Sequence, residues 1–286
     1  MRIYSIIAAA LLIPAAVAAQ TGFDKQSHRG GAGLYAENTI AAAKNALRLG
    51  TTIEMDLYMS KDSQIVVTHD PHIVAAYTLH PNGKPVLPEE EKDLLIKNLA
   101  YSEIAQIETG LRPYDKYPRR KNIYAHIPRF ADLIDSAEHY ARVNHLPPPQ
   151  YNIQPGPAYT ITDDFRKDFI KKMMDIIISR KIQGRAMIQA FDTGMLEVTR
   201  KYYPYMPISF LLGKDEATFD EIFKRLSFKP DIYSPHYTMV TPELVKKCHA
   251  LGMKVLPWTV NTRKEIEDLK AMGVDGIITD YPDFYN

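Results

Sequence analysis

Two histidines and two carboxylates stand out in the first quarter of the chain. His28 begins the stretch HRGGAGLYAENT, His69 follows the apolar run IVV, and Glu54 and Asp56 lie between them in IEMDLYM. Imidazole titrates near neutral pH, so one histidine can take up a proton while another releases one. The two carboxylates lie two residues apart on a predicted strand and face the same side, where they repel each other unless a positive charge lies between them.

The predicted positive charge is a hard divalent cation, Ca2+ or Mg2+, because both ions prefer oxygen ligands. A salt bridge from a neighbouring Arg or Lys explains the carboxylate pair equally well, so the pair alone leaves both interpretations open. Arg29 offers a bidentate donor to a phosphate, and the backbone of Gly30, Gly31 and Gly33 can approach a ligand closely. This set favours metal-assisted attack at a phosphoryl centre.

The elements that position these residues follow from hydrophobic periodicity. Short apolar runs alternate with amphipathic stretches, which predicts βα units around a parallel sheet. The helices include residues 38–50, 127–143, 163–181, 242–252 and 262–273. Nine runs have strand character, at 25–28, 51–59, 65–69, 150–154, 186–191, 207–212, 231–235, 254–260 and 276–280.

The second and third of these strands are joined by the short linker SKDSQ. It is too short for the crossover that parallel neighbours need, so an antiparallel hairpin is predicted. A turn about Lys61 and Asp62 would put His69 opposite Glu54. Eight strands remain, which predicts an α/β fold of the (β/α)8 TIM barrel type, and 286 residues suit one such domain.

In a TIM barrel the functional residues lie at the C-terminal ends of the strands. We therefore expect one mouth to contain His28, Arg29, Glu54, Asp56, Gln154, Trp258 and Asp280. Trp258 either forms a wall of the substrate pocket or packs inside the barrel. Residues from about 71 to 126 do not fit the repeat and are predicted to be a small insertion over the mouth; a passive excursion is the alternative.

The N-terminal residues 1–19 are predicted to be a signal peptide, which leaves 20–286 as the barrel domain. They combine Arg2, an apolar run and small residues near Ala19. The run is shorter than the roughly 20 residues of a membrane span, so we expect export to the periplasm or the medium and no stable membrane anchor. The net charge of +1 gives no sign of a nucleic-acid-binding surface. One chain does not reveal the oligomeric state.

Five motifs in this order resemble the glycerophosphodiester phosphodiesterase family over nearly all of the chain after the leader: HRG with ENT, IEMDLYMSKDSQIVVTHD, IPRFADLI, IQAFD and WTVNTRKEIEDLKAMGVDGIITDYPD. The resemblance implies a barrel with an inserted segment, and a divalent cation that assists hydrolysis of glycerophosphodiesters to glycerol 3-phosphate and an alcohol. It also implies that His28 and His69 are the catalytic acid and base, and that Glu54 and Asp56 bind the metal.

The motif at residues 152–156, on the third of the eight barrel strands, departs from the family pattern. The family has Asn-Ile-Glu-x-Lys, whereas this chain has Gln154, Pro155 and Gly156 in the last three positions. Gln154 still offers a carbonyl oxygen to the metal but no negative charge, which predicts weaker metal binding. Without the Lys, Arg29 is the nearest candidate to bind the phosphate, and Trp258 is a candidate to contact the glycerol.

Two other functions remain open at this point. One is a catalytically impaired protein that binds a phosphodiester on the same scaffold. The other is an enzyme like sphingomyelinase D, which cleaves a phospholipid by intramolecular transfer and leaves a cyclic phosphate. Hydrolysis is favoured because loss of function would not be expected to spare six residues together: His28, Arg29, Glu54, Asp56, His69 and Asp70.

Overall fold

The computed structural model describes residues 22–156, 162–214 and 219–285. The predicted signal peptide, residues 1–19, lies outside the described residues. Within the described ranges, no helix is both long enough and apolar enough to cross a membrane.

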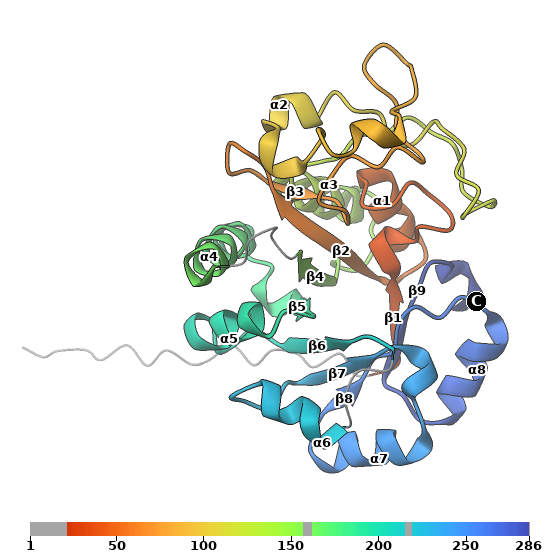
Figure 1. The fold of residues 1–286 in the computed structure, drawn as a ribbon. Coiled ribbons are helices and arrows are strands. Elements are labelled where there is room, and N and C mark those ends of the chain that lie inside the picture. The colour runs from red at the N-terminus through yellow and green to blue at the C-terminus, as the bar shows by residue number, and fades with distance from the viewer. Residues whose placement is uncertain (1–21, 157–161, 215–218, 286) are drawn as a thin grey trace, which may run out of the picture.

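Eight parallel strands form a nearly closed barrel with helices around it, which confirms the predicted fold class (Figure 1). The neighbours around the sheet run in the order β8, β7, β6, β5, β4, β2, β1 and β9. Two backbone hydrogen bonds join the two ends of this order: Asp275 N–H donates to Val255 O and Ile278 N–H donates to Pro257 O, both at 3.0 Å. The strands are β1 (Asp24–Ser27), β2 (Thr52–Met59), β4 (Tyr151–Pro155), β5 (Ala186–Ala190), β6 (Ile208–Leu212), β7 (Ile232–Pro235), β8 (Lys254–Val255) and β9 (Gly276–Thr279).

The ninth strand, β3 (Ile65–Val67), pairs with β2 in the predicted antiparallel hairpin. The predicted register was one residue off. Leu57 pairs with Val67, so the hairpin turns about Asp62 alone, and continuing the ladder would put His69 opposite Met55 rather than Glu54. The reason is a three-residue loop, because Ser60 N–H bonds to Gln64 O at 2.9 Å across it.

Helices follow the barrel strands and cover the outside of the sheet (Figure 1). They are α1 (Ile40–Arg48), α3 (Phe130–Val143), α4 (Asp163–Ser179), α5 (Thr193–Tyr202), α6 (Phe219–Ile222), α7 (Pro242–Ala250) and α8 (Arg263–Ala271). Four of them begin directly after a threonine whose hydroxyl accepts a backbone N–H of the first turn: Thr39, Thr162, Thr241 and Thr262. These N-caps satisfy donors that a helix start leaves without partners.

The segment between β3 and α3 carries little regular structure. It holds the short helix α2 (Tyr101–Ile104) and two 3-10 turns, Pro88–Glu90 and Ile96–Asn98. It has its own buried cluster, separate from the main core and made by Tyr58, Val66, Ile73, Ala75, Val86, Ile96, Ile104, Ile107 and Ile127. Figure 1 shows α2 beside β3, at the side of the barrel where β2 ends. Two strand residues, Tyr58 and Val66, thus anchor the segment to the barrel.

Candidate functional site

A cavity of about 280 Å³ opens at the C-terminal ends of the barrel strands. It is lined by His28, Arg29, Asp56, His69, Lys116, Tyr117, Gln154, Gln189, Phe191, Leu211, Trp258, Thr259, Asn261, Ile278 and Asp280. Six of the seven predicted site residues are among them, and Glu54 is buried beneath. A cavity of about 360 Å³ at the opposite end is lined by the starts of strands and no histidine, and function in TIM barrels lies at the C-terminal end.

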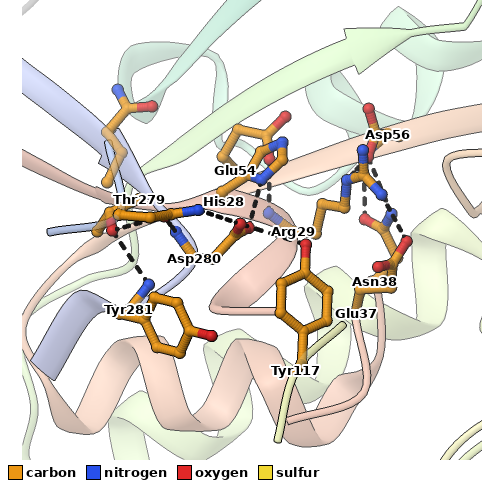
Figure 2. Close-up of polar contacts among 12 residues, drawn as sticks. His28, Arg29, Glu37, Asn38, Glu54, Asp56, Tyr117, Thr279, Asp280 and Tyr281 are labelled. Carbon is orange, nitrogen blue, oxygen red and sulfur yellow. Dashed lines mark hydrogen bonds and ion pairs between the residues drawn. The ribbon is translucent and has the colours of Figure 1, made fainter. Parts of the chain in front are cut away.

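The HRGGAGLYAENT stretch builds one wall of the site. His28 to Gly30 form a 3-10 turn directly after β1, with Arg29 at a positive φ of 52°. Arg29 donates through Nη1 to Glu37 Oε1 at 2.7 Å, and Asn38 donates to Asp56 Oδ2 at 2.9 Å (Figure 2). The polar residues that follow the glycines therefore position Arg29 and Asp56.

Two glycines of this stretch are required for packing inside the protein, while the predicted approach of their backbone to a ligand stays a prediction. A Cβ atom at Gly30 would lie 2.7 Å from Ala42 Cβ, and one at Gly33 would lie 2.3 Å from the Tyr281 ring. Both distances are far shorter than a van der Waals contact. A side chain at either position would therefore collide with the protein's own atoms.

Glu54 and Asp56 share one face of β2 and meet a positive charge from Arg29. The Arg29 guanidinium Nε lies 3.4 Å from Asp56 Oδ2, and the Arg29 backbone N–H donates to Glu54 Oε2 at 2.6 Å. Burial, together with the neighbouring Asp56 charge, raises the pKa of Glu54 to about 7. The salt bridge that the sequence left open is therefore present, but it leaves Glu54 incompletely compensated.

His28 forms a close pair with Asp280, which directly follows β9. Its Nδ1 lies 2.6 Å from Asp280 Oδ1, and Asp280 Oδ2 accepts from the Tyr117 hydroxyl at 3.2 Å (Figure 2). Asp280 Oδ2 also accepts from Asn261 Nδ2 at 2.7 Å. Burial disfavours the charged imidazole, but the charge and hydrogen bond of Asp280 outweigh it and raise the pKa of His28. In return, despite burial, His28 lowers the pKa of Asp280 to about 2. This pair favours a protonated His28.

His69 lies in the turn after β3 and faces the same cavity. Its Nδ1 is 3.4 Å from Asp70 Oδ2, and its side chain is 39% exposed, compared with 16% for His28. Burial lowers the pKa of His69, while the hydrogen bond to Asp70 and the charge of Asp56 raise it, with a net rise. The two histidines thus differ in access to solvent and in the strength of the carboxylate contact.

The predicted donors for a divalent cation are Glu54, Asp56 and Gln154. The Glu54 and Gln154 side-chain oxygens accept from one nitrogen, Gln189 Nε2, at 2.9 and 3.1 Å, so they converge on a common point. Asp56 is the register partner of Gln154. Two carboxylates and an amide oxygen fit a hard cation. No group of three or more His, Cys, Asp or Glu that could hold a metal ion occurs in the described ranges.

Aromatic and aliphatic side chains line the other wall of the cavity. Trp258 donates through its indole N–H to Ser234 O at 3.1 Å and packs edge to face with Phe191, with ring centroids 5.3 Å apart. Leu211 and Ile278 line the cavity beside them. Trp258 therefore both packs on the barrel and forms a pocket wall, which combines the two predicted alternatives.

Several cavity residues received no role from the sequence, among them Lys116, Tyr117, Asn261 and Asp280. Asp280 was expected at the mouth, but its pairing with His28 joins the two ends of the chain and leaves no local signal. Lys116 and Tyr117 come from the segment between β3 and α3, whose path across the mouth depends on tertiary packing. Asn261 and Asp280 both belong to the last motif, WTVNTRKEIEDLKAMGVDGIITDYPD, which marked the region without showing their roles.

A family model described as the glycerophosphoryl diester phosphodiesterase family matches residues 28–284. A glycerophosphodiester phosphodiesterase of Caldanaerobacter subterraneus is 28% identical over 262 residues, which cover 90% of this chain and 93% of the relative. The lysophospholipase D GDPD1 of Homo sapiens is 27% identical and covers 90% and 82%, respectively.

Solved structures of similar proteins share the fold. A candidate glycerophosphoryl diester phosphodiesterase from Silicibacter pomeroyi aligns with a TM-score of 0.83 at 26% identity, covering 93% of this chain and 92% of that chain. A phosphodiesterase from Oleispira antarctica, determined in complex with its product sn-glycerol-3-phosphate, aligns with a TM-score of 0.71 at 20% identity, covering 91% and 93%.

Proposed function

The chain belongs to the glycerophosphoryl diester phosphodiesterase family, and from this premise we propose that it hydrolyses glycerophosphodiesters to glycerol 3-phosphate and an alcohol. It is then a phosphoric diester hydrolase with a small-molecule substrate. Support comes from relatives whose similarity spans nearly their whole length. The observation that carries the proposal is that His28 and His69 line one cavity together with Asp56.

In the proposed mechanism, His28 is the acid and His69 is the base of the first step. Asp280 holds Nδ1 of His28 and favours its protonated form, so Nε2 carries the proton that is transferred. His69 accepts the proton of the glycerol 2-hydroxyl, and the resulting alkoxide oxygen attacks phosphorus. The bond from phosphorus to the leaving alcohol oxygen breaks, and His28 protonates that oxygen.

The second step reverses the two roles. His28, now neutral, takes a proton from water, whose oxygen attacks the cyclic phosphate. The bond between phosphorus and the glycerol 2-oxygen breaks, and His69 returns its proton to that oxygen. The products are glycerol 3-phosphate and the two histidines in their starting states, so one water is consumed per turnover.

Glu54, Asp56 and Gln154 are the residues that would hold the divalent cation. When bound, the ion polarises the phosphoryl oxygen and offsets developing negative charge. Asn38 orients Asp56 by accepting from its backbone N–H at 3.1 Å and donating to its carboxylate. Gln189 orients the oxygens of Glu54 and Gln154.

The test is a coupled assay of glycerol 3-phosphate release from a panel of glycerophosphodiesters, with Ca2+, Mg2+ or a chelator. The variant His28→Ala is expected to lose at least about 100-fold in kcat/KM, the usual contribution of one acid–base group. Activity of the wild type is expected to fall when the chelator removes the metal. His139→Ala, at an exposed histidine on α3, is the matched control and should keep wild-type activity.

The outcomes separate the alternatives that the sequence left open. Release of glycerol 3-phosphate that depends on His28 supports hydrolysis. A cyclic phosphate that accumulates as the end product would instead indicate intramolecular transfer without the second step. Folded protein that binds phosphodiesters but releases nothing from any of them would overturn the proposal in favour of a binding role.

A further inference from the structure

Carboxylates line the cavity, and the arginine that lines it is already paired with carboxylates. Asp56 and Asp280 both line it, and a phosphodiester brings one further negative charge. Arg29 also lines the cavity, but its guanidinium already contacts two carboxylates, Glu37 at 2.7 Å and Asp56 at 3.4 Å. Besides a metal ion held by Glu54, Asp56 and Gln154, a substrate phosphate would be bound more tightly by a side-chain cation whose charge is not already paired.

Lys116 provides such a cation. It is exposed and lines the cavity together with Tyr117, and within the part of the chain that the structure describes it forms no ion pair. Its Nζ lies 4.9 Å from the centroid of the Tyr117 ring, and the Tyr117 hydroxyl is bound to Asp280 at 3.2 Å. The contact with an anchored ring keeps the ammonium at the mouth of the cavity.

At Gly156, directly after β4, there is no room for a cationic side chain. A Cβ atom there would lie 2.5 Å from Cε2 of Tyr58 and 2.9 Å from Leu57 O. The Tyr58 ring belongs to the buried cluster of the segment between β3 and α3, so it has little freedom to move aside. The position where the family motif has Lys is thus closed by an aromatic ring.

We propose that Lys116 binds the substrate phosphate. Lys116 lies in the segment between β3 and α3 and supplies the positive charge that is missing at Gly156, directly after β4. This inference rests on the proposed function for the identity of the diester. The contact is a charge-assisted hydrogen bond from Nζ to a non-bridging phosphate oxygen. Lys116 is a binding residue and takes no part in proton transfer.

The first experiment compares wild type, Lys116→Ala and Lys116→Arg in hydrolysis and in binding of sn-glycerol 3-phosphate and inorganic phosphate by titration calorimetry. Lys116→Ala is expected to raise KM and both dissociation constants about tenfold, as for loss of one hydrogen bond to a charged group, with little change in kcat. Lys116→Arg should restore most of the affinity. Glycerol, which has no charge, should bind wild type and variants alike.

Lys201→Ala is the matched control. Like Lys116, Lys201 is exposed and contacts the ring of the tyrosine that follows it, with Nζ 5.4 Å from the centroid of the Tyr202 ring. Unlike Lys116, it lies at the C-terminal end of α5, away from the cavity. Equal affinity for phosphate in Lys116→Ala and Lys201→Ala would overturn the proposal. A third outcome is that the wild type hydrolyses no diester but binds phosphate, and that Lys116→Ala loses this binding. In that case the proposed function fails while the Lys116 site stands.

Discussion

At the scale of single residues, the arrangement around His28 depends on contacts between distant parts of the sequence. The functional residues themselves could be predicted from the sequence, because two histidines and two carboxylates seldom occur together for another reason: His28, His69, Glu54 and Asp56. Their partners were not, because Asp280 and Tyr117 approach His28 only after the barrel and its inserted segment have folded. Side-chain chemistry can thus be inferred from local sequence, whereas the pairing that sets a pKa is a tertiary property.

Asp280→Asn tests this pairing through pH. The substitution removes the charge that raises the pKa of His28, so the alkaline limb of the kcat/KM profile is expected to move to lower pH. An NMR titration of His28 should move in the same direction. An unchanged alkaline limb would show that His28 is not the acid of the first step.

The same variant should reduce stability in a defined pH window. Asp280 has its pKa lowered to about 2 from 3.8, so its contribution is present above pH 3.8 and is lost as the pH falls through 2. His28 has its pKa raised from 6.5, so its contribution is present below pH 6.5 and is lost as the pH rises through the raised pKa. The loss, about 3 kcal/mol, should be greatest between these limits in urea unfolding. Asp268→Asn, which breaks an exposed pair with Lys264, should leave the free energy of unfolding nearly unchanged.

At the scale of elements, strand positions were largely predictable and strand register was not. Alternation of apolar residues located β2 and β3, and the short linker dictated a hairpin. The ladder depends on the loop conformation, where Ser63 takes a positive φ of 60°, and nothing in SKDSQ specifies that conformation. The close contact of Gly156 with Tyr58 was equally hidden, because it links a residue of β2 to the residue that follows β4.

Gly156→Ala should destabilise the protein by about 1–3 kcal/mol, the usual effect of overpacking. The added methyl group would overlap the Tyr58 ring and Leu57 O. The free energy of unfolding in urea measures the change. Gly184→Ala is the control, because a Cβ there meets nothing within 4 Å. In the double variant Tyr58→Ala/Gly156→Ala the two effects should not add, and strict additivity would contradict the contact.

At the scale of the whole molecule, two hydrophobic clusters share the task of building one site. The barrel cluster holds the strands, while the cluster around Ile96 holds the segment that carries Lys116 and Tyr117. Tyr77, Tyr114 and Tyr117 of the same segment form a row of aromatic rings that ends at the cavity, with successive ring centroids 5.1 and 5.5 Å apart. The sequence predicted a segment over the mouth, but its role could not be read from a stretch with so little periodicity.

Ile96→Ala and Ile177→Ala separate these two contributions. Both isoleucines are fully buried, one in each cluster, and each truncation is expected to cost about 2–5 kcal/mol. Only Ile96→Ala should also raise KM for the diester, assayed at a temperature where both variants remain folded. Equal KM values in the two variants would show that the second cluster does not position the cavity residues.

The pairing of β1 with β9 also has a consequence for biosynthesis. Every residue of β1 has a register partner in β9, from Asp24 with Gly276 to Ser27 with Thr279, and Asp280 follows at once. A nascent chain still missing its last strand lacks both the β1 partner and the carboxylate of the His28 pair. Incomplete translation products should therefore be inactive even where their earlier βα units have formed, and the appearance of turnover during synthesis would mark the moment of ring closure.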